Sequence, residues 1–167
     1  ACRGRGRVPR EERVRVQVPP GMDEGHLLRV PGYGNLGPGG PGDLYLRIRV
    51  RPHPHLERQG PDLVYRLRLG LAQAALGARV EVPGLEGPIP LDIPPGTGHG
   101  EVFALEGGGL PLPGGRGRGT LRVVVELAVP KKLSPKAQKL LRAYAEEVGE
   151  EVAPEGFWER LKGFFRK

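Results

Sequence analysis

The stretch VPPGMDEGHLLRVPGYG (18–34) recurs farther along the same chain as IPPGTGHGEVFALEGGG (93–109). In both copies an apolar residue and two prolines precede a glycine, another glycine lies four positions after it, and glycines also lie 11 and 13 positions after it. Matching glycines, such as Gly21 and Gly96, are 75 positions apart. Each copy then leads through a glycine-rich loop into a long strand of alternating polarity. Matching patterns over about forty residues predict two tandem copies of one β-unit.

A glycine-rich loop can also cradle phosphate, and the sequence disfavours this alternative. A phosphate-binding P-loop has the pattern G-x-x-x-x-G-K-[ST] between a strand and a helix, with the lysine on the phosphates. Neither stretch contains a lysine, and the first lysine of the chain is Lys131. A strand pattern follows each loop, so no helix N-terminus is available to hold an anion. The prolines and glycines are therefore interpreted as turn residues.

Apolar and polar residues alternate along much of the sequence up to about residue 130. LYLRIRV (44–50), LVYRLRLGL (63–71) and LRVVVELAV (121–129) each place apolar side chains on one face of a strand. Such patterns predict half-buried antiparallel strands, with one face on a core and the other in water. LAQAALG (71–77) predicts a short helix that ends at its glycine.

Past Val129 the spacing of the apolar residues becomes helical. Ser134 followed by Pro135 is typical of a helix N-cap with proline at the first helical position. One apolar stripe then runs along the predicted helix. Its members are Ala137, Leu140, Leu141, Tyr144 and Val148.

The final residues carry five large apolar side chains at helical spacing. They are Phe157, Trp158, Leu161, Phe164 and Phe165. Burial of each would contribute about 1.5–3 kcal/mol, whereas in water they would form the exposed patch that marks an interface. We therefore expect these residues to dimerise the chain about a two-fold axis, the commonest arrangement. Packing against the chain's own β-units is the alternative.

The chain carries a formal net charge of +7, mostly from arginine, and much of it lies in RGRGRVPREERVR (3–15). A basic arm can bind nucleic acid or an anionic surface. The arm lacks the aromatic side chains that usually accompany basic residues in nucleic-acid binders. A solvated arm is therefore the favoured interpretation.

Cysteine content and hydropathy give further expectations. The single cysteine, Cys2, can form neither an internal disulfide nor a zinc site by itself. No apolar run is long enough to cross a membrane, and no signal segment opens the sequence. We therefore expect a cytoplasmic protein without membrane contact. Scarce serine and asparagine with abundant proline and arginine suggest a thermophilic source, although GC-rich coding gives a similar bias.

Candidate catalytic residues are few. His53 and His55 lie near Glu57 and Asp62, but the proline-interrupted segment around them suits the end of a strand better than a metal or acid–base site. The only serine, Ser134, is assigned to the helix cap, which excludes a Ser–His–Asp site. We predict no catalytic residue, no metal and no cofactor, and hence no enzyme.

Taken together, these residues resemble the C-terminal substrate-binding region of DnaJ-type co-chaperones along nearly the whole chain. The motifs that carry the resemblance are Val18-Pro19-Pro20-Gly21, Gly42-Asp43-Leu44, His53-Pro54, Arg58 with Gly60, Asp62-Leu63 and Ala75-Leu76-Gly77. The second stretch, from Leu91 to Ser134, continues it.

The resemblance implies a mainly β fold of two tandem small β-sandwich domains followed by C-terminal α-helices. The expected ranges are 1–60 for the first sandwich, 61–130 for the second and 131–167 for a helical dimerisation segment. The first sandwich has no counterpart of DLVYRLRLGLAQAALGARVEV (62–82). Either the first sandwich is incomplete at its N-terminal side or this segment is abbreviated there. CRGRGRV (2–8) resembles the tail of the family's zinc domain, and no zinc is expected with one cysteine.

For function, the resemblance implies binding of exposed hydrophobic segments of unfolded polypeptides and their delivery to a DnaK-type ATPase chaperone. The family's His-Pro-Asp motif, which stimulates that ATPase, is absent here. An extended peptide would add to a sheet edge while an apolar pocket takes a large side chain. The matching peptide-binding positions are Val14, Val16 and Leu56, where relatives usually have phenylalanine in place of Leu56. Ordinary core positions are the alternative for each, and a basic β-rich nucleic-acid-binding module is the alternative function.

Overall fold

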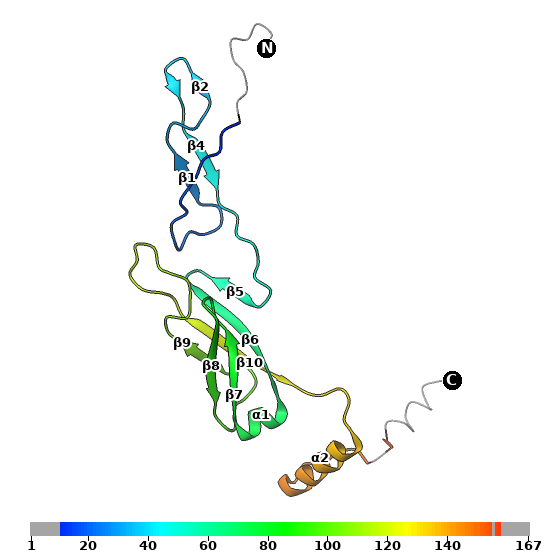
Figure 1. The fold of residues 1–167 in the computed structure, drawn as a ribbon. Helices are drawn as coiled ribbons and strands as arrows, with labels where there is room; N and C mark the ends of the chain where they lie inside the picture. Colours follow the sequence, from blue (N-terminus) through cyan, green and yellow to red (C-terminus); the bar gives the residue numbers. More distant parts are fainter. Residues whose placement is uncertain (1–10, 155, 158–167) are drawn as a thin grey trace, which may run out of the picture. The chain divides into compact units, whose positions relative to one another are not determined.

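The computed structural model describes residues 11–154 together with 156 and 157. Its elements are mostly β-strands, which confirms the predicted fold class (Figure 1). The chain divides into two compact units, residues 1–128 and residues 129–167. Within the described part of the first unit we call residues 14–50 the first repeat and residues 56–128 the second repeat.

The first repeat is built on one antiparallel strand pair. β1 (Leu27–Val30) pairs with β4 (Leu44–Arg47), with Leu28 opposite Leu46. The ladder continues past β4, because Ile48 N donates to His26 O at 2.9 Å. β2 (Leu36–Gly37) and β3 (Gly40–Pro41) form a small second hairpin between them.

The second repeat contains a four-stranded sheet in the order β5-β6-β10-β9. These strands are β5 (Leu56–Gln59), β6 (Asp62–Gly70), β9 (Val102–Leu105) and β10 (Leu121–Ala128). β5 pairs antiparallel with β6, so the predicted boundary between the sandwiches at residue 60 falls in the turn of a hairpin. The three predicted domain ranges stay predictions.

The central pair, β6 and β10, is parallel, and the expectation of antiparallel strands is wrong there. The register runs from Leu63 opposite Leu121 to Gly70 opposite Ala128. Alternation of apolar and polar residues indicates which face of the sheet a side chain takes, but not whether the neighbouring strand runs parallel or antiparallel. A parallel pair needs a long crossover, and the segment between β6 and β10 supplies one.

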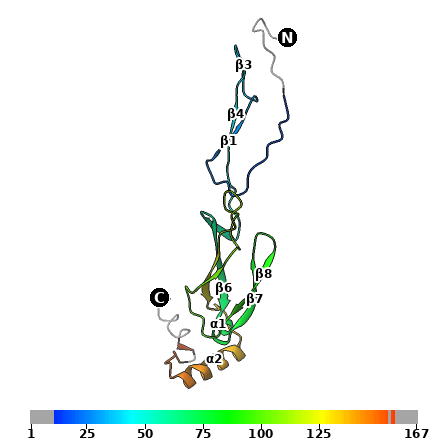
Figure 2. The ribbon, with the colours of Figure 1, turned by 90° about the vertical axis from the view of Figure 1, so that its left-hand side faces the viewer.

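That crossover begins with α1 (Leu71–Leu76), which ends at Gly77 (φ 83°) as predicted. The hairpin of β7 (Ala78–Pro83) and β8 (Pro88–Ile93) follows and is visible beside β6 in Figure 2. Side chains from the hairpin and from the sheet share one hydrophobic core. Its buried members include Leu67, Leu69, Val82, Leu91, Ile93, Leu121, Val123 and Val125.

The first repeat lacks this second layer in the described residues. Leu44 and Leu46 match Leu121 and Val123 of the second repeat, which are 0% exposed, yet both are only half-buried. Val14 and Val16 match Ile89 and Leu91 of β8 by the 75-residue offset.

Val14 and Val16, which are predicted from the sequence to be peptide-binding positions, nevertheless lie outside any strand. In the second repeat β8 is held by β7, and the described part of the first repeat offers no counterpart of β7. The segment that holds Val14 and Val16 therefore has no strand to pair with, and both side chains remain half-buried.

The C-terminal unit contains α2 (Pro135–Val148). Ser134 Oγ accepts a hydrogen bond from Ala137 N at 3.2 Å, which confirms the predicted cap. The helix ends at Gly149, whose φ of 75° is left-handed. Beyond it, Arg142 Nη1 donates to Ala153 O at 2.9 Å and ties the following chain back to the helix.

No helix in the described part of the chain combines the length and the apolar character needed to cross a membrane.

Candidate functional site

Leu56 begins β5 and is held there by a side-chain cap. His53 Nδ1 accepts main-chain hydrogen bonds from His55 N at 3.2 Å and from Leu56 N at 3.1 Å. Leu56 lies opposite Tyr65 of β6 and is 6% exposed. It therefore belongs to the sheet and core of the second repeat rather than to a pocket of the first repeat alone.

A surface pocket of about 540 Å³ opens beside Leu56. Its apolar lining comes from β5, β6, the turn between β7 and β8, the loop after β9 and the segment after β4. The apolar aliphatic side chains are Val50, Leu56, Leu63, Leu85 and Leu110. Sequence periodicity could not assemble this set, because its members come from five separate segments.

The rim of the pocket is charged, and most of its charges already have partners. Glu24 Oε2 accepts a hydrogen bond from Val50 N at 3.3 Å. Glu57 pairs with Arg66 at 3.2 Å, and the hydrogen bond from Arg66 Nε to this carboxylate is the main reason that the pKa of Arg66 is raised. The pocket thus offers an apolar floor and a rim of nearly compensated charge.

One wall of the pocket belongs to the first repeat. Asp23 and Glu24 of the first Pro-Pro-Gly turn line it, and Arg58 of β5 binds that turn. Arg58 Nη1 donates to Met22 O at 3.0 Å. The sequence singled out Arg58 only as part of a motif, and its role as a bridge becomes visible only in the tertiary structure.

The turn also approaches the second repeat closely at Gly21. Gly21 has a φ of 80°, and a Cβ placed there would lie 2.6 Å from Pro111 O. Only glycine satisfies both the left-handed backbone and this contact. The matching glycine of the second repeat, Gly96, shares the φ but has nothing within 4 Å of such a Cβ.

The other predicted peptide-binding residues lie elsewhere. Val14 lines a second pocket of about 840 Å³ together with Tyr33, Leu36 and Leu44. Val16 lines neither pocket. The structure therefore does not bring Val14, Val16 and Leu56 together in a single pocket.

An acidic residue at the edge of that second pocket is fixed by two donors. Asp43 accepts a hydrogen bond from Gly32 N at 3.1 Å and from Arg29 Nε at 2.6 Å. The Gly32 N–H, and after it the Arg29 guanidinium, hold the pKa of Asp43 below its ordinary value. This arrangement closes the glycine-rich loop of the first repeat rather than leaving a carboxylate free for a ligand.

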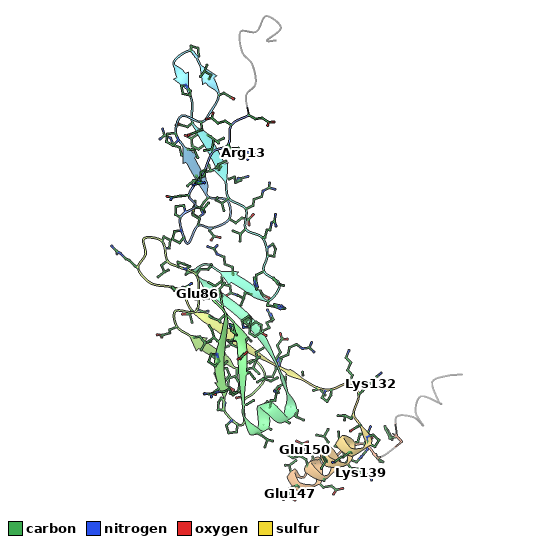
Figure 3. All side chains as sticks on the ribbon, in the orientation of Figure 1. Arg13, Glu86, Lys132, Lys139, Glu147 and Glu150 are labelled. Carbon is green, nitrogen blue, oxygen red and sulfur yellow. The ribbon has the colours of Figure 1, made fainter. Side chains whose placement is uncertain are left out.

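Of the predicted dimerisation residues, Phe157 is described and is 38% exposed. Trp158, Leu161, Phe164 and Phe165 lie outside the described residues. α2 adds an apolar stripe at four-residue spacing, formed by Leu140, Tyr144 and Val148, with exposed fractions of 63%, 54% and 48%. Charged side chains, among them Lys139 and Glu147, project from the same helix (Figure 3).

Of the two histidines of the proline-rich segment, His53 hydrogen-bonds the backbone. His53 caps β5, and its ring centroid lies 6.2 Å from that of His55. In the described residues no three His, Cys, Asp or Glu side chains gather in a group that could hold a metal ion. Cys2 is not among those residues, so the expectation of no zinc stays a prediction.

Arginines on the strand faces of the second repeat are largely paired with carboxylates. Arg66 contacts Glu57 and Glu126, and Arg122 lies 2.9 Å from Asp62 Oδ2. In the first repeat Arg47 and Arg49 are exposed, and none of the ion pairs of the described chain involves them. Other cations of the described chain, among them Arg13, Arg68 and Arg116, also lack an ion pair, so unpaired positive charge is not confined to the first repeat.

Comparison with known families gives one matching family model, the DnaJ C terminal domain, over residues 5–130. Curated relatives named "Chaperone protein DnaJ" match almost the whole chain. The protein of Acetivibrio thermocellus is 44% identical over 99% of this chain and 42% of its own length. The protein of Leptospira biflexa is 40% identical over 99% of this chain and 44% of its own length. The protein of Methanothermobacter thermautotrophicus is 42% identical over 96% of this chain and 44% of its own length. The chain spans less than half the length of these relatives.

Proposed function

Because this chain belongs to the DnaJ C-terminal domain family, we propose that it binds exposed hydrophobic segments of unfolded polypeptides. We further propose that the whole protein passes these segments to a DnaK-type ATPase chaperone. The binding step needs no catalytic group, and none is assigned. The names of the relatives support a chaperone role, and the pocket beside Leu56 is the observation that carries the binding step.

The pocket suits one large apolar side chain of an extended client. Five aliphatic side chains line it, and its volume of about 540 Å³ exceeds that of any single residue. Burial of one such side chain contributes about 1.5–3 kcal/mol, which alone gives a dissociation constant weaker than 1 mM. Main-chain hydrogen bonds to a strand edge would add affinity without sequence preference.

Dimerisation would compensate for the weakness of a single pocket. We propose that Phe157, Trp158, Leu161, Phe164 and Phe165 pair two copies of the chain. The exposed stripe of α2 supports an additional apolar contact in the same C-terminal unit. Two pockets on one dimer bind a flexible client at high effective concentration, so avidity replaces the strength of a single contact.

The test uses a pocket residue that the core does not need. Leu85 lines the pocket and is 45% exposed, whereas Leu76 at the end of α1 is 80% exposed and lines none of the pockets described above. We expect Leu85→Asp to weaken binding of a fluorescein-labelled, reduced and unfolded protein, measured by anisotropy. Leu76→Asp introduces the same charge and is the matched control. Equal affinities of the two variants would contradict the pocket assignment.

A basic nucleic-acid-binding module is the second candidate, supported by exposed and unpaired Arg47 and Arg49 and by the net charge of +7. Binding to a polyanion weakens steeply with salt because counterions are released. Hydrophobic client binding persists at moderate salt. Stronger binding of single-stranded or duplex DNA than of the unfolded protein, lost on raising the salt, would favour this candidate.

A further inference from the structure

The two Pro-Pro-Gly turns share a backbone shape but dock on different partners. In the second repeat Gly96 N and Thr97 N donate to Ala74 O of α1, at 2.9 and 3.1 Å. The described part of the first repeat has no counterpart of α1. Its turn instead accepts a hydrogen bond through Met22 O from Arg58, which belongs to the second repeat.

Arg58 is anchored at both ends of its guanidinium. Its Nε donates to Gly60 O in its own hairpin turn at 3.0 Å, and its Nη1 donates to Met22 O at 3.0 Å. Its Nη2 lies 3.5 Å from Asp23 Oδ1. The planar fork thus spans from β5 to the first turn with its side chain 24% exposed.

The pocket beside Leu56 depends on where that turn lies. Asp23 and Glu24 form one wall, and Leu56, Leu63 and Leu110 belong to the opposite repeat. A shift of the turn away from β5 would widen the pocket and remove one side of its lining. The contacts of an apolar side chain fall off steeply once a gap opens.

We propose that Arg58 is a positioning residue for client binding, which holds the first Pro-Pro-Gly turn against the second repeat and so fixes the width of the pocket. This inference rests on the proposed function. It also identifies a point at which client affinity is set by a polar contact between repeats rather than by the apolar lining.

The first experiment compares Arg58→Leu, Arg58→Lys and the control Arg79→Leu in the full 167-residue chain. Arg79 pairs with Asp92 on the exposed side of the β7–β8 hairpin and lines no pocket described above. We expect Arg58→Leu to speed amide exchange in residues 21–26 about tenfold and to weaken client affinity about tenfold, as loss of a charge-assisted hydrogen bond would. Arg58→Lys should recover part of both, because an ammonium can still reach Met22 O, and Arg79→Leu should change neither.

A tether separates positioning from direct contact. In a Cys2→Ser background, Asp23→Cys and Arg58→Cys are joined by a short bis-maleimide, which holds the turn without any guanidinium. Asp23 and Arg58 both line the pocket, so the control is the same double variant with each cysteine capped by N-ethylmaleimide, which places similar bulk there without joining the two positions. We expect the tethered chain to show slower exchange and higher affinity than the capped chain. Slower exchange without higher affinity than the capped chain would overturn the proposal.

Unchanged exchange in Arg58→Leu would also overturn it. If the unaltered chain bound no unfolded protein, the proposed function would fail, while the exchange comparison would still decide whether Arg58 holds the turn.

Discussion

Glu24 and His99 occupy matching positions in the two repeats, and each supports a strand by accepting one main-chain hydrogen bond. Glu24 Oε2 accepts from Val50 N at 3.3 Å, and His99 Nδ1 accepts from Leu127 N at 3.1 Å. A side chain thus supplies the last rung of the ladder in both repeats. The same main-chain hydrogen bond is thus present in both repeats, with a carboxylate as acceptor in the first and an imidazole in the second.

Removal of either rung should cost stability. We expect Glu24→Ala and His99→Ala each to lower the free energy of unfolding by about 0.5–1.5 kcal/mol, because a strand N–H loses its acceptor. Glu24→Gln and His99→Gln keep an acceptor of similar reach and serve as controls. Urea unfolding followed by circular dichroism measures the difference, and equal stabilities of the alanine and glutamine variants would contradict the role of the rungs.

Asp43 should make the stability of the first repeat sensitive to acid. Its pKa in the folded chain is lowered, chiefly by the Gly32 N–H and then by Arg29, so the unfolded chain binds the proton more tightly. The stabilisation is therefore fully present above the ordinary carboxyl pKa of about 3.9 and is lost as the pH falls through the lower folded value.

Urea unfolding of the chain and of Asp43→Asn at pH 6, 4 and 3 checks this expectation. The stability gap between the two should be widest at pH 6 and should narrow towards pH 3. The second repeat has Thr120 at the matching position and cannot contribute a like effect. A constant gap across the series would contradict the assignment.

Two glycines with the same backbone conformation should respond differently to a methyl group. Gly21 and Gly25 have φ of 80° and 82°, so alanine at either is strained by about 1–2 kcal/mol. A Cβ at Gly25 meets nothing within 4 Å, whereas at Gly21 it meets Pro111 O at 2.6 Å. We expect Gly21→Ala to lower the unfolding free energy by at least about 1 kcal/mol more than Gly25→Ala. Equal losses in chemical denaturation would show that the turn does not press on Pro111.

Truncation after Pro154 should convert a dimer to a monomer. It removes all five predicted dimerisation residues and leaves α2 complete with its Ser134 cap. Analytical ultracentrifugation of the full chain should give about twice the 18.1 kDa chain mass, and the truncated chain should give the mass of one truncated chain, which is slightly below 18.1 kDa. Far-ultraviolet circular dichroism checks that α2 persists. If truncation left the oligomeric state unchanged, the tail would not be the dimerisation segment, and packing against its own chain would be favoured.

The repeat could be read from sequence because turn glycines have a backbone requirement that survives changes in side chains. Gly25 and Gly100 have the same φ of 82°, and Gly32 and Gly107 have φ of 77° and 74°. The helix cap at Ser134 could also be predicted from the sequence, since it depends on neighbouring residues alone. Local geometry is what a sequence pattern encodes most directly.

The site was harder to predict from the sequence because it depends on contacts between distant segments. The lining of the pocket joins Val50, Leu56 and Leu110, and no periodicity relates them. Val14 and Val16 carry a strand pattern, but a strand also needs a neighbour, and the pattern cannot report that the neighbour is missing from the described residues. Arg58 fits a motif, yet its hydrogen bond spans 36 positions to Met22.

The parallel pairing of β6 with β10 has a consequence for synthesis of the chain. Leu63 pairs with Leu121, and Leu69 pairs with Leu127. The central ladder can therefore form only after almost the whole second repeat has been synthesised. Until then β6 has β5 and the β7–β8 hairpin as neighbours, but the edge and the core contacts that β10 supplies are missing. The incomplete core then exposes apolar surface, as do the unfolded segments that we propose the finished protein binds. Pairing over such distances is slow to form. Each newly made chain is thus, for a time, a substrate for the activity we propose for it.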